Sequence, residues 1–570
     1  MGLLCSKSNV SNDISTDTQS RKSASSSNGS TSVRSSIAAK RSQFVKTNNK
    51  RWNDDYIALK TLGAGITGSV QLVKRKGTEN LFAKKSINVD DQDPAQMKEL
   101  RNEIALLREL DHPNIVHLYE CFEHDGQIHL IMENCEGGEL YKMFIHGSET
   151  YHAFTEDEIS KICFGALSAL AYCHQKGIVH RDLKPQNIVF PQTGNVTDVK
   201  IIDFGMSKKG MKRTIFGRRA IQTACGTPLY VAPEIVSGAR YDEKIDIWAI
   251  GVLTYHMACG RHPFQGRDQD ETLDNIERHK GITFPGKKWR EKSPVLKSFI
   301  DQLLKPKIRA RPSASEALRH PFLAGEANAI DDTPARAKTK ASAQDTLDRM
   351  QKFSSYPDIK RAALMAIAHK LHTNEIGGLR QAFQKIDTKH TGTIDRSEFN
   401  QLAELLGDDG NLSEEELSAI FDAADIDNSG QIAYGEFLAA TLDTNIFLRE
   451  DRLRDAFNLL DDDSSGTITH KNLRTLLGDE FEKIQIDTML AAADVKHNGV
   501  IDFEEFLLLM RGTTAGVTEG EEEKEEEEKE KEKEKEKEKE EEKANADSPS
   551  TTTPTTSAEV VAEVDCEQEK

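Results

Sequence analysis

The sequence predicts a multidomain protein in which an α+β domain is followed by an all-α domain, with a disordered tail at each end. Three observations predict this fold class. At 570 residues, the chain is too long for one compact core. A glycine-rich loop between two alternating, β-branched segments opens the first half. An acidic twelve-residue pattern with a central glycine occurs four times in the second half.

The composition narrows the classes of function. The chain has 75 Lys and Arg against 94 Asp and Glu, a net charge of −19, which disfavours a protein devoted to nucleic acid. The eight cysteines are scattered with no C-x-x-C pair, so we expect reduced thiols in an intracellular protein. No apolar run approaches the roughly 18–20 residues that a membrane span needs. We expect a cytoplasmic protein, monomeric and without a nucleic-acid partner.

Both ends of the chain have a low-complexity composition. Residues 1–50 are rich in Ser, Thr, Asn and Lys, and residues 513–570 contain a Glu/Lys run followed by a Ser/Thr/Pro stretch. Such segments cannot bury enough apolar surface to fold, so both are predicted to be disordered. The acidic tail is predicted to be solvated, with an interaction arm as the alternative.

The first six residues, MGLLCS, fit an acylation signal. Gly2 followed by Ser6 matches the myristoylation pattern, and Cys5 stands where a second acyl chain could be added. One myristoyl chain holds a membrane only marginally, so the second chain would give stable anchoring. We predict membrane attachment through Gly2 and Cys5.

The first motif with a chemical meaning is LGAGITGSV, which contains Gly63, Gly65 and Gly68. In a dinucleotide-binding fold, the glycines of such a motif open a helix. Here the next residues, SVQLVKRK, alternate and are β-branched, and NLFAKKSI predicts a further strand. A glycine loop between two strands is the arrangement that covers the phosphates of ATP.

A series of motifs follows in a fixed order. Lys85 lies in FAKKSI, and Glu103 lies in a helical stretch from which it could pair with Lys85. HRDLKPQN supplies Asp182, DFG supplies Asp203, and APE and DIWAIG come further on. Together these motifs make residues 56–322 resemble a eukaryotic protein kinase, which implies a bilobal α+β kinase fold. The KP pair of HRDLKPQN resembles serine/threonine kinases.

The resemblance implies phosphoryl transfer from ATP with Mg²⁺, where positioning and charge neutralisation do most of the catalysis. The implied catalytic residues are Asp182 as the base, Lys184 near the transferred phosphate, Asn187 and Asp203 as Mg²⁺ ligands, and Lys85 held by Glu103. The implied nucleotide contacts are Leu62, Gly63, Gly65, Gly68, Val70, Ala83, Lys85, Met132, Asn187 and Asp203. A pseudokinase is the alternative, but such proteins usually lack Lys85, Asp182 or Asp203, and all three are present.

Two further features bear on substrates and activation. Glu139 resembles the acid that reads a basic residue upstream of the phosphorylated site, so we expect protein substrates with basic residues near Ser or Thr. Arg181 of HRD normally needs an anion to order it, and residues 206–233 contain several basic residues but no Asp or Glu. We hypothesise that phosphate on Thr223, ahead of Thr214, supplies this charge. Ordering by docking of the other domain is the alternative.

The acidic repeats of the second half begin at Asp387, Asp425, Asp461 and Asp494. Each has glycine at position six and isoleucine at position eight, and apolar helical segments flank them. This pattern identifies four EF-hands in a calmodulin-like domain over residues 375–512, with the isoleucines pairing the loops within two lobes.

Ligand chemistry separates the four loops. The second is nearly complete and should bind Ca²⁺ best, whereas Asn472 replaces the bidentate glutamate of the third. Lys389 and Lys496 stand at position three of the first and fourth loops, where a cation repels Ca²⁺ and removes a ligand. The predicted ligands, from the second loop to the third, first and fourth, are Asp425, Asp427, Ser429, Gln431 and Glu436; Asp461, Asp463, Ser465, Thr467 and Thr469; Asp387, Thr391, Thr393, Asp395 and Glu398; and Asp494, Asn498, Val500, Asp502 and Glu505.

A junction over residues 323–374 joins the two halves. Leu364, Ile367 and Leu371 lie on one face of a basic segment, as in helices that a calmodulin-like groove binds, although a purely structural linker helix is the alternative. Pro357 predicts one helix through TLDRMQKF and a second that starts near the proline.

With this order of domains, the chain resembles a calcium-dependent protein kinase. The resemblance implies that the junction blocks the substrate cleft at rest, with Arg349 or Lys352 as pseudosubstrate contacts. Calcium would then let the EF-hand domain withdraw the junction. A constitutive kinase with structural EF-hands and a calcium-binding scaffold are the alternatives.

Overall fold

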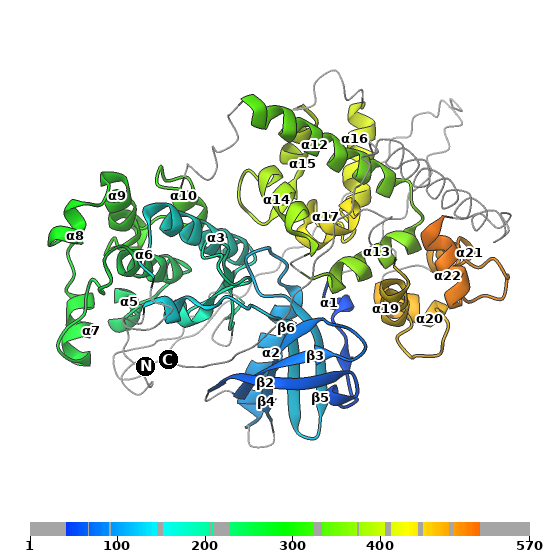
Figure 1. Cartoon of the computed structure of the whole chain (residues 1–570), viewed down its shortest axis with the longest axis horizontal. Coiled ribbons are helices and arrows are strands. Elements are labelled where there is room, and N and C mark those ends of the chain that lie inside the picture. The colour runs from blue at the N-terminus through cyan, green and yellow to red at the C-terminus, as the bar shows by residue number, and fades with distance from the viewer. Residues whose placement is uncertain are drawn as a thin grey trace, which may run out of the picture.

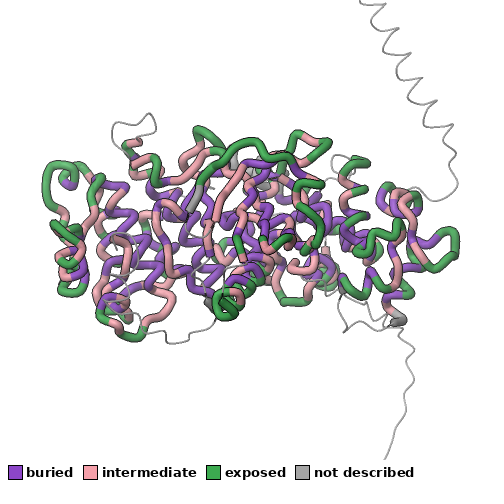
Figure 2. The backbone as a smooth tube through the Cα atoms, turned by 90° about the horizontal axis from the view of Figure 1, so that it is seen from below, coloured by how far each residue is buried: buried purple, intermediate pink, exposed green. Residues whose placement is uncertain are grey.

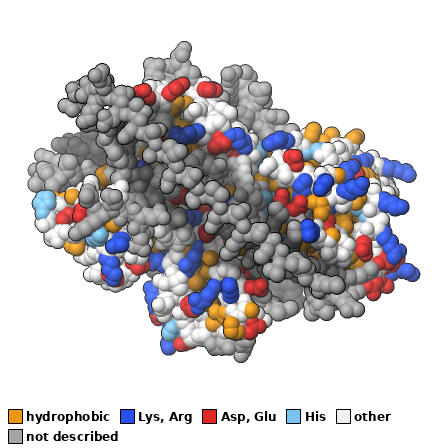
Figure 3. Space-filling view, turned by 180° about the vertical axis from the view of Figure 1, so that it is seen from behind, with side chains coloured by type: hydrophobic (Ala, Val, Ile, Leu, Met, Phe, Trp, Pro, Cys, Tyr) orange, Lys and Arg blue, Asp and Glu red, His pale blue; other side chains and the backbone are white. Residues whose placement is uncertain are grey.

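The computed structural model describes residues 41–65, 68–89, 93–144, 152–204, 208–209, 229–323, 333–372, 375–404, 412–442, 449–477 and 483–512. Within them the chain forms a β-rich lobe, a helical lobe and a second helical body that contains the acidic repeats (Figure 1). Buried residues run through the interior of each part (Figure 2). Charged side chains of both signs are interspersed with hydrophobic ones over the described part of the face in Figure 3. No helix in the described ranges is long and apolar enough to span a membrane.

The β-rich lobe is a six-stranded sheet in the order β1-β5-β6-β4-β3-β2, accompanied by helix α2. The strands on either side of the glycine loop pair with each other, which confirms the predicted hairpin. Helix α2 begins at a capping box in which the Asp93 carboxylate accepts from the backbone of Ala95 and Gln96. The bounds are β1 Thr47–Asn48, β2 Tyr56–Gly65, β3 Gly68–Arg75, β4 Leu81–Asn88, α2 Pro94–Glu109, β5 Leu118–His124 and β6 Gln127–Glu133.

The helical lobe is built around α3 and α6. Helix α6 is apolar along most of its length and almost entirely buried, as expected for a helix inside a large core. The bounds are β7 Gly138–Glu139, α3 Glu156–Gln175, β8 Ile178–Val179, β9 Ile188–Phe190, β10 Lys200–Ile201, β11 Lys208–Lys209, α5 Pro233–Val236, α6 Lys244–Cys259, α7 Gln269–Glu277, α8 Lys287–Arg290, α9 Pro294–Leu303 and α10 Ala314–Leu318.

The second helical body contains the four loops in two pairs. Ile394 pairs with Ile432 in the β12–β13 ladder, and Ile468 pairs with Ile501 in a single bridge, which confirms the predicted pairing of the isoleucines. The bounds are α14 Gly377–Ile386, β12 Thr393–Asp395, α15 Arg396–Glu404, α16 Glu414–Ala424, β13 Gln431–Ala433, α17 Tyr434–Thr441, α19 Glu450–Leu460, α20 His470–Leu477, α21 Lys483–Ala491 and α22 Phe503–Arg511.

The junction consists of α12 (Thr333–Ser354) and α13 (Asp358–Lys370), separated at Pro357 as predicted. Helix α12 packs on α16 and α17, and α13 packs on α17 and α19 (Figure 1). Leu364, Ile367 and Leu371 are buried in one cluster with apolar residues of the EF-hand loops and helices. The predicted face of this basic helix is therefore in contact with the EF-hand domain.

The predicted disordered segment, residues 1–50, includes residues that are folded in the structure. Residues 41–48 form a short helix, α1 (Arg41–Phe44), and the edge strand β1. Phe44 and Val45 are buried, and β1 pairs in parallel with β5. The composition of this segment did not predict folding because its order comes from contacts with two domains that lie far away in the sequence.

Candidate active site and calcium loops

The predicted phosphate-binding lysine lies on β4. Lys85 Nζ is 3.2 Å from Asp203 Oδ1 and 3.8 Å from Glu103 Oε1, so the structure brings these three predicted residues together. Burial raises the pKa of Glu103, while the nearby Lys85 ammonium opposes this shift. The lysine is therefore held between two carboxylates at the boundary of the two lobes.

The predicted catalytic base belongs to a second cluster. Lys184 Nζ lies 2.6 Å from Asp182 Oδ2, and Asn187 Nδ2 donates to the same oxygen at 3.2 Å and to the Asp182 carbonyl at 2.7 Å. The carboxylate is thus oriented by two donors, and its position is fixed within the loop that follows β8.

Asp246 of the DIWAIG motif supports this loop, a role that the sequence analysis did not assign. Its carboxylate accepts from the backbone of His180 and of Arg181, each at 2.9 Å, and is 2.9 Å from His174 Nε2. Burial alone would raise the pKa of Asp246, but the contacts with His174, His180 and Arg181 hold it below its ordinary value. The sequence did contain a signal for this role, because Asp246 is the single acid in the apolar helix α6 and a buried charge needs hydrogen-bond partners.

The predicted nucleotide contacts lie on the hairpin and on the neighbouring strands β4 and β6. Gly65 and Gly68 face each other at the end of the hairpin, and Ala83 pairs with Met132 across β4 and β6. A side chain at Gly68, whose φ is +135°, would come within 1.9 Å of the Ser86 carbonyl. Leu62, Gly63 and Val70 lie on the two strands of the hairpin.

The donor set fits ATP with Mg²⁺. Asp203 and Asn187 offer carboxylate and amide oxygens, which are the hard ligands that Mg²⁺ prefers, and Lys85 offers an ammonium to phosphate. Bound there, Mg²⁺ would supply neutralisation of phosphate charge. Thr214 and Thr223 lie outside the described residues.

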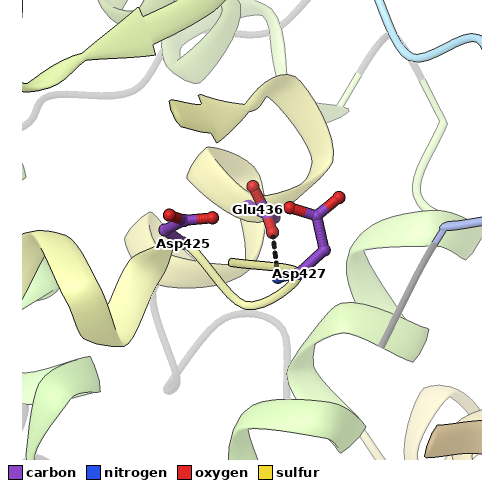
Figure 4. Close-up of side chains that lie close together, drawn as sticks. All are labelled: Asp425, Asp427 and Glu436. Carbon is purple, nitrogen blue, oxygen red and sulfur yellow. Dashed lines mark hydrogen bonds between the residues drawn. The ribbon is translucent and has the colours of Figure 1, made fainter. Parts of the chain in front are cut away.

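The second acidic loop forms a cluster of three carboxylates. Oxygens of Asp425, Asp427 and Glu436 all lie within 4.8 Å of one another (Figure 4), and no other described group of acids, histidines or cysteines meets this criterion. Glu436 also accepts from the backbone of Asp427 at 3.0 Å and of Ala433 at 2.7 Å. Burial and then the neighbouring acids raise the pKa of Glu436 well above its ordinary value. Three carboxyl groups whose oxygens lie this close together fit a divalent cation such as Ca²⁺.

The first and fourth loops hold a lysine where a ligand should be, as predicted. Lys389 Nζ forms an ion pair with Asp395 and contacts Ser397 Oγ at 2.7 Å. Lys496 Nζ forms the equivalent pair with Asp502. In both loops the lysine side chain bends toward the acid at position nine. The carboxylate of that acid is therefore paired with the lysine ammonium group.

These two loops nevertheless keep the backbone pattern of the second. In the first loop, Glu398 accepts from the backbone of Lys389 at 2.8 Å and of Asp395 at 3.0 Å, while Asp387 accepts from Thr391 and Gly392. In the fourth, Glu505 accepts from the backbone of Lys496 and Asp502, and Asp494 accepts from that of Asn498 and Gly499. Thr393 and Val500, at position seven, complete the predicted sets.

The third loop has a neutral amide in place of the final glutamate. Asn472 Oδ1 accepts from the backbone of Thr469 at 2.8 Å, and its Nδ2 is 3.3 Å from Asp463 Oδ1. A donor therefore points at the carboxylate of position three. Asp461 accepts from the backbone of Ser465 and Gly466, and Ser465 Oγ donates to the Thr467 carbonyl at 3.0 Å, as Ser429 does to Gln431 in the second loop.

Ion pairs connect the EF-hand domain and the junction to the kinase-like half. Arg380 forms a two-pronged pair with Asp198, and Arg75 forms one with Asp455 at 2.6 and 2.8 Å. Lys370 pairs with Glu120. These pairs join both lobes of the EF-hand domain and the junction to the kinase-like half.

The structure does not place the predicted pseudosubstrate residues in the substrate cleft. Arg349 pairs with Asp345 at 3.0 Å and donates to the Thr441 carbonyl at 3.2 Å, on the EF-hand side. Lys352 is an exposed residue on the same helix. In this arrangement α12 contacts the EF-hand domain through several helices.

Comparisons with known proteins agree with this geometry. Residues 56–323 match the protein kinase domain, and residues 378–442 and 450–511 each match the EF-hand domain pair. The chain is 33% identical to calcium-dependent protein kinase 5 of Plasmodium falciparum over 482 residues, covering 82% of this chain and 80% of that protein. It is 34% identical to calcium-dependent protein kinase 4 of Plasmodium berghei (81% of this chain, 87% of that one) and 33% identical to calcium-dependent protein kinase 11 of Oryza sativa (81% and 77%).

Proposed function

Because this chain belongs to the calcium-dependent protein kinase family, we propose that Ca²⁺ binding to its second EF-hand loop controls phosphate transfer from ATP to Ser or Thr of protein substrates. One observation carries the proposal. A complete set of phosphoryl-transfer residues and a single cluster of three carboxylates among the described residues occur in one chain.

In the proposed mechanism, Lys85 orients the ATP phosphates and is itself held by Glu103. Asp182 accepts the proton of the substrate hydroxyl, and the hydrogen bond from Asn187 keeps its carboxylate in place. Lys184, 2.6 Å from Asp182, is near enough to follow the transferred phosphate. Asp203 and Asn187 would hold Mg²⁺. These roles are mostly electrostatic, as phosphoryl transfer requires.

Regulation is proposed to be a change in which surface the junction contacts. With Ca²⁺, the junction is bound by the EF-hand domain, as α12 and α13 are in the structure. Without Ca²⁺, the junction would block the substrate cleft, with Arg349 or Lys352 entering it. Ca²⁺ can shift this equilibrium only by binding the withdrawn state more tightly.

The proposal also covers substrates, membrane attachment and phosphorylation. Substrates are expected to carry a basic residue near the phosphorylated Ser or Thr, because Glu139 resembles the acid that reads such a residue. Attachment to membranes is expected through acylation of Gly2 and Cys5, which lie outside the described residues. Phosphate on Thr223 or Thr214, also outside them, is proposed to pair with Arg181.

A constitutive kinase with structural EF-hands is the second candidate. The lysine ion pairs of the first and fourth loops favour it, because those loops hold their shape through internal contacts.

The test is phosphate transfer to a basic serine peptide with Mg·ATP, across a Ca²⁺ titration that starts in chelator. Activity that rises with Ca²⁺ and is lost in Asp203→Asn supports the proposal. Equal activity at every Ca²⁺ concentration would establish the constitutive alternative. A peptide without basic residues, assayed in parallel, tests the substrate preference.

A further inference from the structure

We infer that residues 41–48, the N-terminal strap, connect the EF-hand domain to helix α2 and thereby position Glu103 for Lys85. This inference rests on the proposed calcium regulation and adds a route by which docking of the EF-hand domain reaches the catalytic residues. Figure 1 shows the strap's helix α1 next to the sheet and α13. Helix α1 contacts both α2 and the EF-hand helix α20.

Two adjacent side chains of the strap lie in different hydrophobic cores. Phe44 is fully buried in the cluster formed by the junction and the EF-hand domain, whereas Val45 is buried in the core of the kinase domain. Phe44 is buried only while the junction and the EF-hand domain are docked, and the backbone joins it directly to Val45 in the kinase core. The strap therefore orders fully only when the EF-hand domain is docked.

Arg41 binds the end of α2. Its guanidinium donates to the carbonyl of Leu110, the residue that caps this helix, and pairs with Asp111 at 2.7 Å. A cation at the C-terminal end of a helix satisfies free carbonyls and stabilises the helix dipole. The same guanidinium contacts His117 Nδ1 at 2.8 Å, and His117 Nε2 is 3.0 Å from the carbonyl of His369 in α13. Arg41 thus joins α2 to the junction.

The rest of the strap extends both contacts. Lys46 Nζ donates to the Asn458 carbonyl at 2.7 Å and lies 3.8 Å from Asp462, within the third EF-hand loop. On the other side, Arg108 of α2 donates to Thr47 Oγ1, and the backbone of Cys121 donates to the Lys46 carbonyl at 3.0 Å. One short segment therefore bridges the third loop, the sheet edge and the last turn of α2.

The consequence concerns Glu103, which α2 carries into contact with Lys85. Fixing the C-terminal end of α2 restricts its rotation and so restricts the position of Glu103. We therefore assign Arg41 and Phe44 as positioning residues, which touch neither substrate nor nucleotide. Their loss should affect the site that holds the ATP phosphates more than the site that holds the peptide.

The experiment compares full-length Phe44→Ala and Lys46→Ala with wild type at saturating Ca²⁺, with the exposed Arg51→Ala as the matched control. We expect Phe44→Ala to raise KM for ATP and lower kcat, for a loss of about tenfold in kcat/KM, with KM for the peptide unchanged. Lys46→Ala should show the same pattern with a loss of about threefold. Hydrogen exchange of residues 99–109 should be faster in both variants than in Arg51→Ala.

The outcomes separate this inference from the proposed function. A wild type that does not respond to Ca²⁺ overturns the proposed function, and the inference with it. A responsive wild type with unchanged KM for ATP and unchanged exchange in Phe44→Ala overturns the inference alone. If Phe44→Ala lowers kcat but leaves KM for ATP unchanged, a smaller fraction of folded enzyme explains the result, and the inference fails. Should Phe44→Ala not fold, Lys46→Ala, at a partly buried position outside both cores, decides by the same two readouts.

Discussion

The first and second EF-hand loops lie side by side in one lobe, yet they differ in what completes them. Their ladder joins Thr393 to Ala433 and Asp395 to Gln431, and the backbone hydrogen bonds of the two loops correspond. Position three is Lys389 in one and Asp427 in the other. In the first loop an internal ammonium ion meets the acid at position nine, whereas in the second three carboxylates face one another without such a partner.

The first loop also packs against the kinase domain. His390 packs edge-on against Phe164 of the kinase domain, with ring centroids 4.6 Å apart, and Gly392 lies against His112. The first loop, which has a lysine at position three, thus serves as a docking surface, and its neighbour holds the three acids. The pair teaches that the fixed shape of an EF-hand loop can supply a contact between domains as well as a metal site.

The strongest test of this difference removes the bidentate acid of the second loop. Glu436→Gln should weaken Ca²⁺ binding there by about 100-fold, or about 2.7 kcal/mol, because it removes a charge and a ligand. Calcium stimulation of the kinase should be lost over the same range. Calorimetric titration and the peptide assay measure the two effects.

The matched control is Glu398→Gln, at the same position of the first loop. It should leave the Ca²⁺ midpoint nearly unchanged, because Lys389 already prevents tight binding there. A large shift in Glu398→Gln, equal to that of Glu436→Gln, would mean that the first loop is also a sensor.

A second test restores the missing acid. Lys389→Asp should free Asp395 and raise Ca²⁺ affinity of the first loop by about tenfold or more, since a repulsive charge becomes a ligand. Titration should then show one additional site. Lys385→Asp, on the helix before the loop, is the control for the change in net charge. An unchanged number of sites would show that docking on the kinase domain, and not the lysine, prevents binding.

Whether the sequence predicts a feature depends on how far apart its residues lie along the chain. The catalytic motifs and the acidic loops are local, so their residues follow from short segments, although the ion pair of Lys389 with Asp395 was not predicted. The pairing of Arg380 with Asp198 spans 182 positions, and nothing in either segment marks it. The strap was missed for the same reason: its composition is that of a solvated tail, and its partners lie in two other domains. Asp246 was within reach, because an acid in an apolar helix must find donors.

A third test addresses docking directly. Gly392 and Gly430 have φ of +73° and +80°, so alanine strains the backbone equally at both positions. A side chain at Gly392 would come within 2.2 Å of the buried His112 ring, whereas at Gly430 nothing lies within 4 Å. Gly392→Ala should therefore lower the stability of the docked, Ca²⁺-loaded protein by about 1 kcal/mol more than Gly430→Ala. Thermal unfolding with Ca²⁺ measures the difference, and equal midpoints would contradict a docking role for the first loop.

The smallest expected effect separates docking from metal binding by pH. His369 of α13 is buried against the kinase sheet, where burial, and then Lys370 and Arg41, lower its pKa well below 6.5. Nε2 contacts the Tyr119 carbonyl, and Nδ1 has no hydrogen-bond partner in the described part of the chain. The docked state therefore binds fewer protons than the undocked state. Docking is fully stable above pH 6.5 and weakens as the pH falls below that value.

Between pH 7 and pH 6 this histidine should cost the docked state about 0.7 kcal/mol, calculated from the ordinary pKa of 6.5 in the undocked state. The measurement is the unfolding midpoint of the Ca²⁺-loaded protein at both pH values, for wild type and for His369→Gln. All other titrating groups are the same in the two proteins, so the difference between them isolates His369. His124→Gln, at a partly exposed site on the same sheet, is the control and should behave as wild type. If His369→Gln loses as much stability as wild type on acidification, the pH response does not come from His369.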